Sequence, residues 1–161
     1  MHHSPVLFFE SPNLTEQLKL NSNFVKAAVI CHESFKDEAE QLCQSFYDIP
    51  VQMFFFSSVE GIRTFITAQK MGTCFYLLAN WDDAAKISAI AVEEGVSEEE
   101  LQIKVIGPKR KYIYCMKCFT SSEIDAVAEE VQCNCGVHLN VGPFYSKVRK
   151  GYIGYPFIPE K

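Results

Sequence analysis

Four of the seven cysteines in this chain occur as two close pairs, and this spacing is the strongest constraint on how the end of the chain folds. The first pair is Cys115 and Cys118, and the second is Cys133 and Cys135, with fourteen residues between the pairs. Two short cysteine pairs joined by an arm are typical of a zinc ribbon, in which four thiolates close a tetrahedron around one ion. The sequence therefore predicts a small C-terminal zinc ribbon, which metal binding helps to fold because the segment carries little apolar bulk.

The identity of the ion and one of its ligands stay open at this point. The second pair is one residue shorter than the usual Cys-x-x-Cys spacing, and His138, three residues after Cys135, is an alternative ligand. Zinc is the expected ion, and iron in a rubredoxin-like site is the alternative because both metals accept four thiolates. A closed set of four cysteines leaves no position for a substrate water, so zinc would be structural, whereas iron would carry an electron.

The larger first part of the chain alternates apolar runs with amphipathic stretches. Four apolar runs predict buried strands over residues 24–30, 50–56, 73–79 and 101–106, and a further edge strand is expected over residues 6–9. Between these runs, apolar residues recur at helical spacing. Near-continuous apolar strands that alternate with helices are typical of a parallel sheet covered on both faces. The sequence therefore predicts an α/β fold with a parallel sheet flanked by helices.

Polar residues mark the expected helix starts, and glycines mark the expected ends. Ser34, followed three residues later by Asp37, has the pattern of a helix cap. Ser57 and Asn80 stand at the corresponding places before the second and third helices. Gly72 and Gly95 follow the last apolar positions of those two helices, where a C-terminal glycine is expected.

The composition changes at Gly107-Pro108, so we predict two domains, an α/β domain over residues 1–107 and the zinc ribbon over residues 108–161. Residues 1–103 hold 6 basic and 15 acidic side chains, whereas residues 104–161 hold 9 basic and 5 acidic side chains. The first part of the chain is therefore acidic and the second part is basic. The chain shows no signal-peptide pattern and no apolar run of about 18 residues. These features, together with an odd number of cysteines, favour a reducing, cytoplasmic location without a membrane span. Three cysteines stand singly in apolar segments: Cys31, Cys43 and Cys74.

The end of the α/β part resembles the end of the ferredoxin-reductase nucleotide-binding domain. Residues 75–79, a helix, a Gly-Val-x-x-Glu corner at residues 95–99 and residues 101–107 follow the order of that family. The resemblance implies a Rossmann-like, ferredoxin-reductase-like sheet. Residues 79–81 replace the Cys-Gly-Pro turn of the family, and residues 31–34 (Cys-His-Glu-Ser) lack the glycines that let backbone amides approach a pyrophosphate. We therefore expect a degenerate scaffold without a bound nucleotide.

The C-terminal segment resembles the C-terminal domain of a dimethylamine monooxygenase subunit family. The match rests on the aromatic residues 112–114, the two cysteine pairs, Gly136, Leu139, Val141, residues 144–146 and the closing Gly-Tyr-Ile-Gly of residues 151–154. The resemblance implies an accessory, non-catalytic subunit of a multicomponent, haem-dependent amine monooxygenase of the dimethylamine type. The implied partners are a haem-containing catalytic subunit, together with the flavin and iron–sulfur reductase components that deliver electrons from NADPH. A docking role with structural zinc, and no catalytic residue, is the resulting expectation.

Other functions stay open from the residues themselves. Basic and aromatic residues near the cysteines suit nucleic-acid binding, although a sequence pI near 5.4 argues against it. Cys31 and His32, at the end of a predicted strand, have the residue types of a Cys/His nucleophile, without a third partner at fixed spacing. The tyrosine-rich residues 151–157 predict either an interface anchor or a strand that packs on the ribbon itself.

Overall fold

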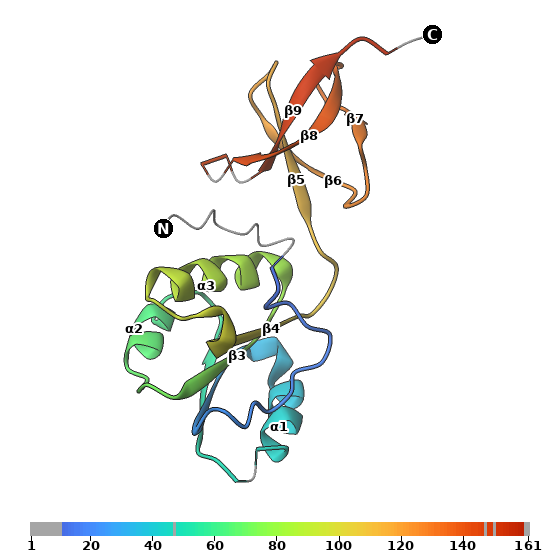
Figure 1. Ribbon diagram of the computed structural model, residues 1–161. Coiled ribbons are helices and arrows are strands. Elements are labelled where there is room, and N and C mark those ends of the chain that lie inside the picture. Colours follow the sequence, from blue (N-terminus) through green and yellow to red (C-terminus); the bar gives the residue numbers. More distant parts are fainter. Residues whose placement is uncertain (1–10, 47, 147, 150, 160–161) are drawn as a thin grey trace. The chain divides into compact units, whose positions relative to one another are not determined.

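The computed structural model describes residues 11–46, 48–146, 148–149 and 151–159, and the chain divides into two compact units (Figure 1). The N-terminal unit spans Met1–Pro108, and the C-terminal unit spans Lys109–Lys161. The described residues of the N-terminal unit form an α/β fold, and those of the C-terminal unit form β-strands and turns. Each unit has a hydrophobic core of its own.

A parallel sheet forms the centre of the N-terminal unit. Its strands are β1 (Lys26–His32), β2 (Val51–Phe56), β3 (Thr73–Ala79) and β4 (Leu101–Val105), in the order β2-β1-β3-β4. Every neighbouring pair is parallel, so the prediction of an α/β fold with a parallel sheet is confirmed. β1 begins two residues later than predicted because Val25 lies in a bend, where its N–H donates to the carbonyl of residue 72 at 2.9 Å.

Helices cover both faces of this sheet. α1 (Lys36–Gln44) lies on one face, and α2 (Ile62–Thr67) and α3 (Trp81–Glu93) lie on the other (Figure 1). Successive side chains of a strand point to opposite faces. Phe75 therefore joins the core beneath α2 and α3, while Tyr76 joins the core beneath α1. Burial on both faces explains why the strand sequences are apolar at nearly every position.

The start of α3 is set by Asn80, as predicted. Its side-chain oxygen accepts a hydrogen bond from the backbone N–H of Asp83 at 2.9 Å, which satisfies one of the free amides of the first turn. Gly95 follows this helix with a φ of 86°, a conformation that glycine adopts readily. No helix within the described ranges combines the length and the apolar character that a membrane crossing requires.

Two other predicted helix starts are wrong. Ser34 does not cap α1, because the 3-10 turn η2 (Glu33–Phe35) precedes the helix and places Phe35 at its N-cap, with no side-chain cap. The N–H of Ser34 donates to Nδ1 of His32 at 3.1 Å, which caps the 3-10 turn. Ser57 does not cap α2, which begins five residues later, after Gly61 at a φ of 85°. Ser and Thr oxygens cap local turns as readily as helices, so the pattern alone does not distinguish the two.

The remaining expectations for this unit concern one turn and one strand. Gly72 lies in the turn before β3, with a φ of 88°, and does not end α2, whose C-cap is Ala68. The 3-10 turn η3 (Glu98–Glu100) leads into β4 and is closed by reciprocal hydrogen bonds between Ser97 and Glu100. The strand expected over residues 6–9 lies outside the described residues.

A curled, mixed sheet forms the C-terminal unit. Its strands are β5 (Lys111–Cys115), β6 (Ser121–Ile124), β7 (Glu130–Gln132), β8 (His138–Ser146) and β9 (Gly151–Phe157), in the order β6-β5-β9-β8-β7. β5 with β6 and β7 with β8 are antiparallel hairpins. β9 pairs parallel with β5 and antiparallel with β8, so it joins the two hairpins into one sheet.

The tyrosine-rich residues 151–157 are therefore the middle strand of this sheet. This agrees with the prediction of a strand that packs on the ribbon itself. Gly154 of β9 lies where the neighbouring strands leave no room for a side chain. A Cβ atom at this position would lie 2.7 Å from Cδ1 of Ile113 in β5 and 3.1 Å from Cδ1 of Leu139 in β8. The absence of a side chain lets three strands close around one small core.

This close packing predicts that Gly154→Ala destabilises the C-terminal unit by about 1–3 kcal/mol, the usual effect of overpacking a core. Thermal melts of the full chain, followed by near-UV circular dichroism, measure the change. Ile113→Ala removes both of the nearest atoms, Cδ1 at 2.7 Å and Cγ1 at 2.8 Å, so the double variant is expected to lose less stability than the two single changes added together. Strictly additive losses would contradict the contact.

Candidate metal centre

The four paired cysteines lie in the turns of the two hairpins. Cys115 is the last residue of β5, and Cys118 stands in the turn that leads to β6. Cys133 and Cys135 stand in the turn between β7 and β8. These residues are far apart in the sequence, and the sheet brings them together because β9 holds both hairpins.

The sulfur atoms of the four cysteines all lie within 4.8 Å of one another. The Sγ atoms of Cys118 and Cys133 are 3.5 Å apart, and those of Cys115 and Cys135 are 4.0 Å apart. A tetrahedral zinc ion with Zn–S bonds of about 2.3 Å requires sulfur atoms about 3.8 Å apart. The observed separations lie on either side of that value, so the cluster can hold a metal ion of this size.

The first turn, residues 115–120, is shaped around the sulfur of Cys115. The backbone N–H groups of Lys117 and Cys118 each point at this Sγ, with nitrogen–sulfur distances of 3.4 Å. The N–H of Cys115 donates to the carbonyl of Thr120 at 2.9 Å, and the N–H of Phe119 donates to the carbonyl of Cys115 at 2.8 Å. Amides that point at a sulfur stabilise the thiolate, which is the form that binds a metal.

The second turn is closed by a glycine. The N–H of Cys133 donates to the carbonyl of Val137 at 2.9 Å, and the N–H of Gly136 donates to the carbonyl of Cys133 at 2.8 Å. Gly136 has a φ of 96°, which the tight return of the chain requires. This turn brings the sulfur of Cys135 to the cluster although the pair is one residue shorter than usual. Gly136 was not predicted as a turn residue, although its position directly after the pair was a signal for one.

Hydrogen bonds and burial separate the acidities of two cysteines in the cluster. Hydrogen bonds to the side chain and the backbone of Thr120 lower the pKa of the Cys118 thiol to about 6. A hydrogen bond to the backbone of Cys135 lowers the pKa of Cys133, but burial and the nearby sulfur of Cys118 raise it further, to about 12. Thiolates at this separation repel one another, so the cluster loses its later protons only when a cation replaces them.

His138 is not part of the cluster. It is the first residue of β8, and its ring packs edge-on against Phe157 with the ring centroids 6.0 Å apart. Among the described residues, the group of close metal-ligating side chains consists of the four cysteines. The ring of His138 therefore lies against Phe157 and is not one of the clustered ligands.

The residues of the suggested Cys/His nucleophile do not form an activated pair. Cys31 is buried in β1, and this burial, together with Glu38 and Cys43 nearby, raises the pKa of its thiol to about 12. The Nδ1 atom of His32 already accepts a hydrogen bond from the N–H of Ser34. The thiol stays protonated at neutral pH, and the ring nitrogen closes a turn instead of taking its proton.

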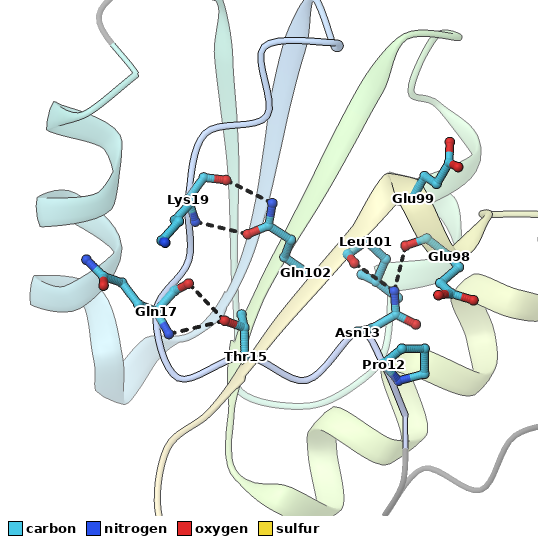
Figure 2. A pocket seen from close by; sticks show the side chains of 9 residues that line it. All are labelled: Pro12, Asn13, Thr15, Gln17, Lys19, Glu98, Glu99, Leu101 and Gln102. Atoms are coloured by element: carbon cyan, nitrogen blue, oxygen red, sulfur yellow. Dashed lines mark hydrogen bonds between the residues drawn. The ribbon is translucent and has the colours of Figure 1, made fainter.

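A polar groove of about 390 Å³ lies in the N-terminal unit beside β4 (Figure 2). The side-chain amide of Asn13 donates to the carbonyls of Glu98 and Leu101 at 2.7 and 2.8 Å. The side chain of Gln102 exchanges two hydrogen bonds with the backbone of Lys19, at 3.0 and 2.8 Å. These polar groups satisfy one another, so the segment of residues 13–19 covers the edge strand β4 of the sheet.

Basic side chains of the C-terminal unit lie over its own aromatic rings. The guanidinium carbon of Arg149 is 5.1 Å from the ring centroid of Tyr114, and that of Arg110 is 5.4 Å from the ring centroid of Tyr112. Arg110 also forms an ion pair with Glu123 at 2.7 Å. Bases that stack on these rings would have to displace the cations, so the arrangement does not favour nucleic-acid binding.

The geometry predicts which substitutions remove metal binding. Cys118→Ser and Cys133→Ser each replace one of four converging sulfur atoms, so their metal affinity is expected to fall by more than the roughly 10–100-fold typical of residues behind the ligands. His138→Ala, the matched control, is expected to leave affinity unchanged because the ring lies against Phe157. Competition with a chromophoric chelator measures all three, and a loss with His138→Ala would contradict the ligand set.

No family model, no characterised protein and no solved structure matches the chain. Similarity to known proteins therefore assigns neither a family nor an activity. The candidate metal centre rests on the convergence of its four sulfur atoms.

Proposed function

We propose that the four cysteines bind one structural Zn²⁺ and that the C-terminal unit is a zinc ribbon. The observation that carries this proposal is the placement of four sulfur atoms within 4.8 Å of one another. Four thiolates fill the tetrahedral coordination of zinc and leave no position open for a substrate. Among the described residues, the hydrophobic core cluster of the unit has four buried members, Ile113, Cys115, Cys133 and Leu139, and two of them are proposed metal ligands. A unit with so small a core needs a metal to fold.

We further propose that the chain is an accessory, non-catalytic subunit of a multicomponent, haem-dependent amine monooxygenase of the dimethylamine type. This proposal is supported by the resemblance of residues 112–154 to the dimethylamine monooxygenase family, in which the two cysteine pairs precede an Ala-Tyr-Met-Gly-like motif. Residues 151–154, Gly-Tyr-Ile-Gly, stand at the place of that motif in this chain. That segment is part of β9, which holds the two cysteine turns in one sheet. The elements that carry the resemblance thus form one connected structure. The partners in this proposal are the flavin and iron–sulfur reductase components, together with the haem-containing subunit.

The carboxyl ends of β1 and β3 support the view that the N-terminal unit is a scaffold. In an open parallel sheet, ligands bind where the strand order reverses, which in this sheet lies between these two strands. His32 follows the buried part of β1, and Asn80 follows β3. Both side chains accept hydrogen bonds from the backbone of the turns that follow them. Glu33 adds a carboxylate where a nucleotide phosphate would need a positive or neutral surface.

A rubredoxin-like electron-transfer component is the second candidate, and one observation favours it. Cys135 is exposed, whereas Cys115 and Cys133 are buried. An exposed ligand gives a bound iron a short path for an electron to leave the protein. Iron and zinc accept the same four thiolates, so the metal itself distinguishes these candidates.

Metal analysis of the native full chain tests the proposal directly. We expect one zinc per chain and no visible absorbance, because zinc has a filled d shell. Red iron–thiolate bands with one iron per chain would support the electron-transfer candidate instead.

Chelation is expected to unfold the C-terminal unit and to leave the N-terminal unit intact, since only the former depends on the metal. Hydrogen exchange read by mass spectrometry distinguishes the units. Amides of β5, β8 and β9 should lose their protection after chelation, while those of β1 and β3 keep it. A metal-free chain with protected β5 and β9 would contradict the structural role of zinc.

Co-expression with the haem-containing and reductase subunits of a dimethylamine-type monooxygenase tests the subunit role. We expect the chain to co-purify at a fixed ratio with a protein that carries a haem absorption band. Cys118→Ser should weaken this association, because the unit that docks is the unit that the metal folds. A salt-sensitive shift of labelled single-stranded DNA, without a haem partner, would favour the nucleic-acid alternative.

A further inference from the structure

The first cysteine turn exposes two large apolar side chains. The side chain of Met116 is 43% exposed, and that of Phe119, directly after Cys118, is 62% exposed. Both belong to the short segment that is held by the hydrogen bonds around Cys115. The hydrogen-bonded turn thus exposes an aromatic ring and a thioether to solvent.

Phe119 also has an unfavourable backbone conformation. Its φ is 60°, and it is the one non-glycine residue with a positive φ within the described ranges. Bulky residues rarely adopt this conformation, whereas glycine adopts it freely. The second cysteine turn has Gly136 at the corresponding position, directly after its second cysteine, with a φ of 96°. Glycine would therefore form the first turn more easily, and the strain at an exposed phenylalanine points to a use of the ring beyond the fold.

The residues around this ring carry positive charge. The ring centroid of Phe119 lies 6.4 Å from that of Tyr114, over which the guanidinium of Arg149 lies at 5.1 Å. Lys117 is exposed on the same turn. Tyr114 itself is buried, and we call the exposed surface beside it the knuckle face: Met116, Lys117, Phe119 and Arg149. It combines two apolar side chains with two cations, and none of these four described residues is acidic.

We propose that the knuckle face docks a protein partner that presents an apolar pocket for Phe119, bordered by carboxylates that pair with Lys117 and Arg149. The proposal rests on the proposed function and makes the haem-containing subunit that partner. Binding energy in protein interfaces concentrates in aromatic and arginine side chains that fill pockets. Complementary charges at the rim orient the partner and exclude others.

Other occupants fit these residues less well. A two-fold contact between copies of the chain would bring the same cations against one another. Nucleic acid requires several phosphate contacts, and two other basic residues of the unit are engaged within it: Arg110 pairs with Glu123, and the ammonium of Lys111 lies 4.7 Å from the ring centroid of Tyr152. An acidic protein surface with a pocket is complementary to both the charges and the exposed ring.

The test uses the metal-loaded full chain and the haem-containing subunit that co-purifies with it. Phe119→Gly removes the ring and suits the backbone, so it should weaken binding roughly tenfold or more, while zinc content is unchanged and Tm is unchanged or higher. Lys117→Glu should also weaken binding, because it reverses one charge of the face. Val127→Ser is the control, since Val127 is 84% exposed in the connection after β6, at the other end of the hairpin. It should leave the Kd within about twofold, as expected of a residue outside the interface.

The outcomes separate the docking face from the subunit role. An intact complex with an unchanged Kd for Phe119→Gly would overturn the docking face and leave the proposed function standing. A lower Tm or a loss of zinc in this variant would show that Phe119 serves the fold, and would overturn the inference. Failure of the wild-type chain to bind the haem subunit would overturn both. Binding of single-stranded DNA, or a dimer in sedimentation, that Phe119→Gly abolishes would reassign the face to nucleic acid or to a second copy.

Discussion

The C-terminal unit depends on the meeting of four sulfur atoms between two hairpin turns. β6 has 4 residues and β7 has 3, and hairpins this short are marginally stable in water. The backbone connects the hairpins through β9, and the side chains connect them where Cys115 and Cys133 enter the core. A cation at this point joins the turns directly and removes the repulsion between thiolates. Folding and metal binding are therefore one process in the proposed zinc ribbon.

The N-terminal unit is stabilised in a different way. Its sheet is buried on both faces, and two separate apolar clusters lie between the sheet and the helices. The polar atoms at the carboxyl edge of the sheet are used to close turns, as the side chains of His32 and Asn80 show. The polar residues beside β4 also satisfy one another. Among the described residues, the cluster of metal-ligating side chains belongs to the other unit.

The two cysteine turns solve one geometric problem with different residues. Each turn needs a positive φ after its cysteines, and the second meets this need with Gly136, which lies in open space. The first turn uses Phe119, which is strained and exposed. The second turn therefore only reverses the chain direction, whereas the first turn also exposes an aromatic side chain. The proposed docking face follows from this asymmetry and from the positive charges around it.

The sequence by itself determined the features that depend on neighbours along the chain. Apolar runs marked the parallel strands, Asn80 marked the start of α3, and the cysteine spacing marked the sulfur atoms that converge. The tertiary structure alone decided that residues 151–157 form the middle strand, that His138 stays outside the cluster, and that Phe119 takes a left-handed conformation. It also moved the starts of α1 and α2. The middle strand and the place of His138 depend on contacts between residues distant in sequence, which local spacing does not encode. The helix starts and the Phe119 turn depend on a choice between local hydrogen bonds that the same residue pattern allows.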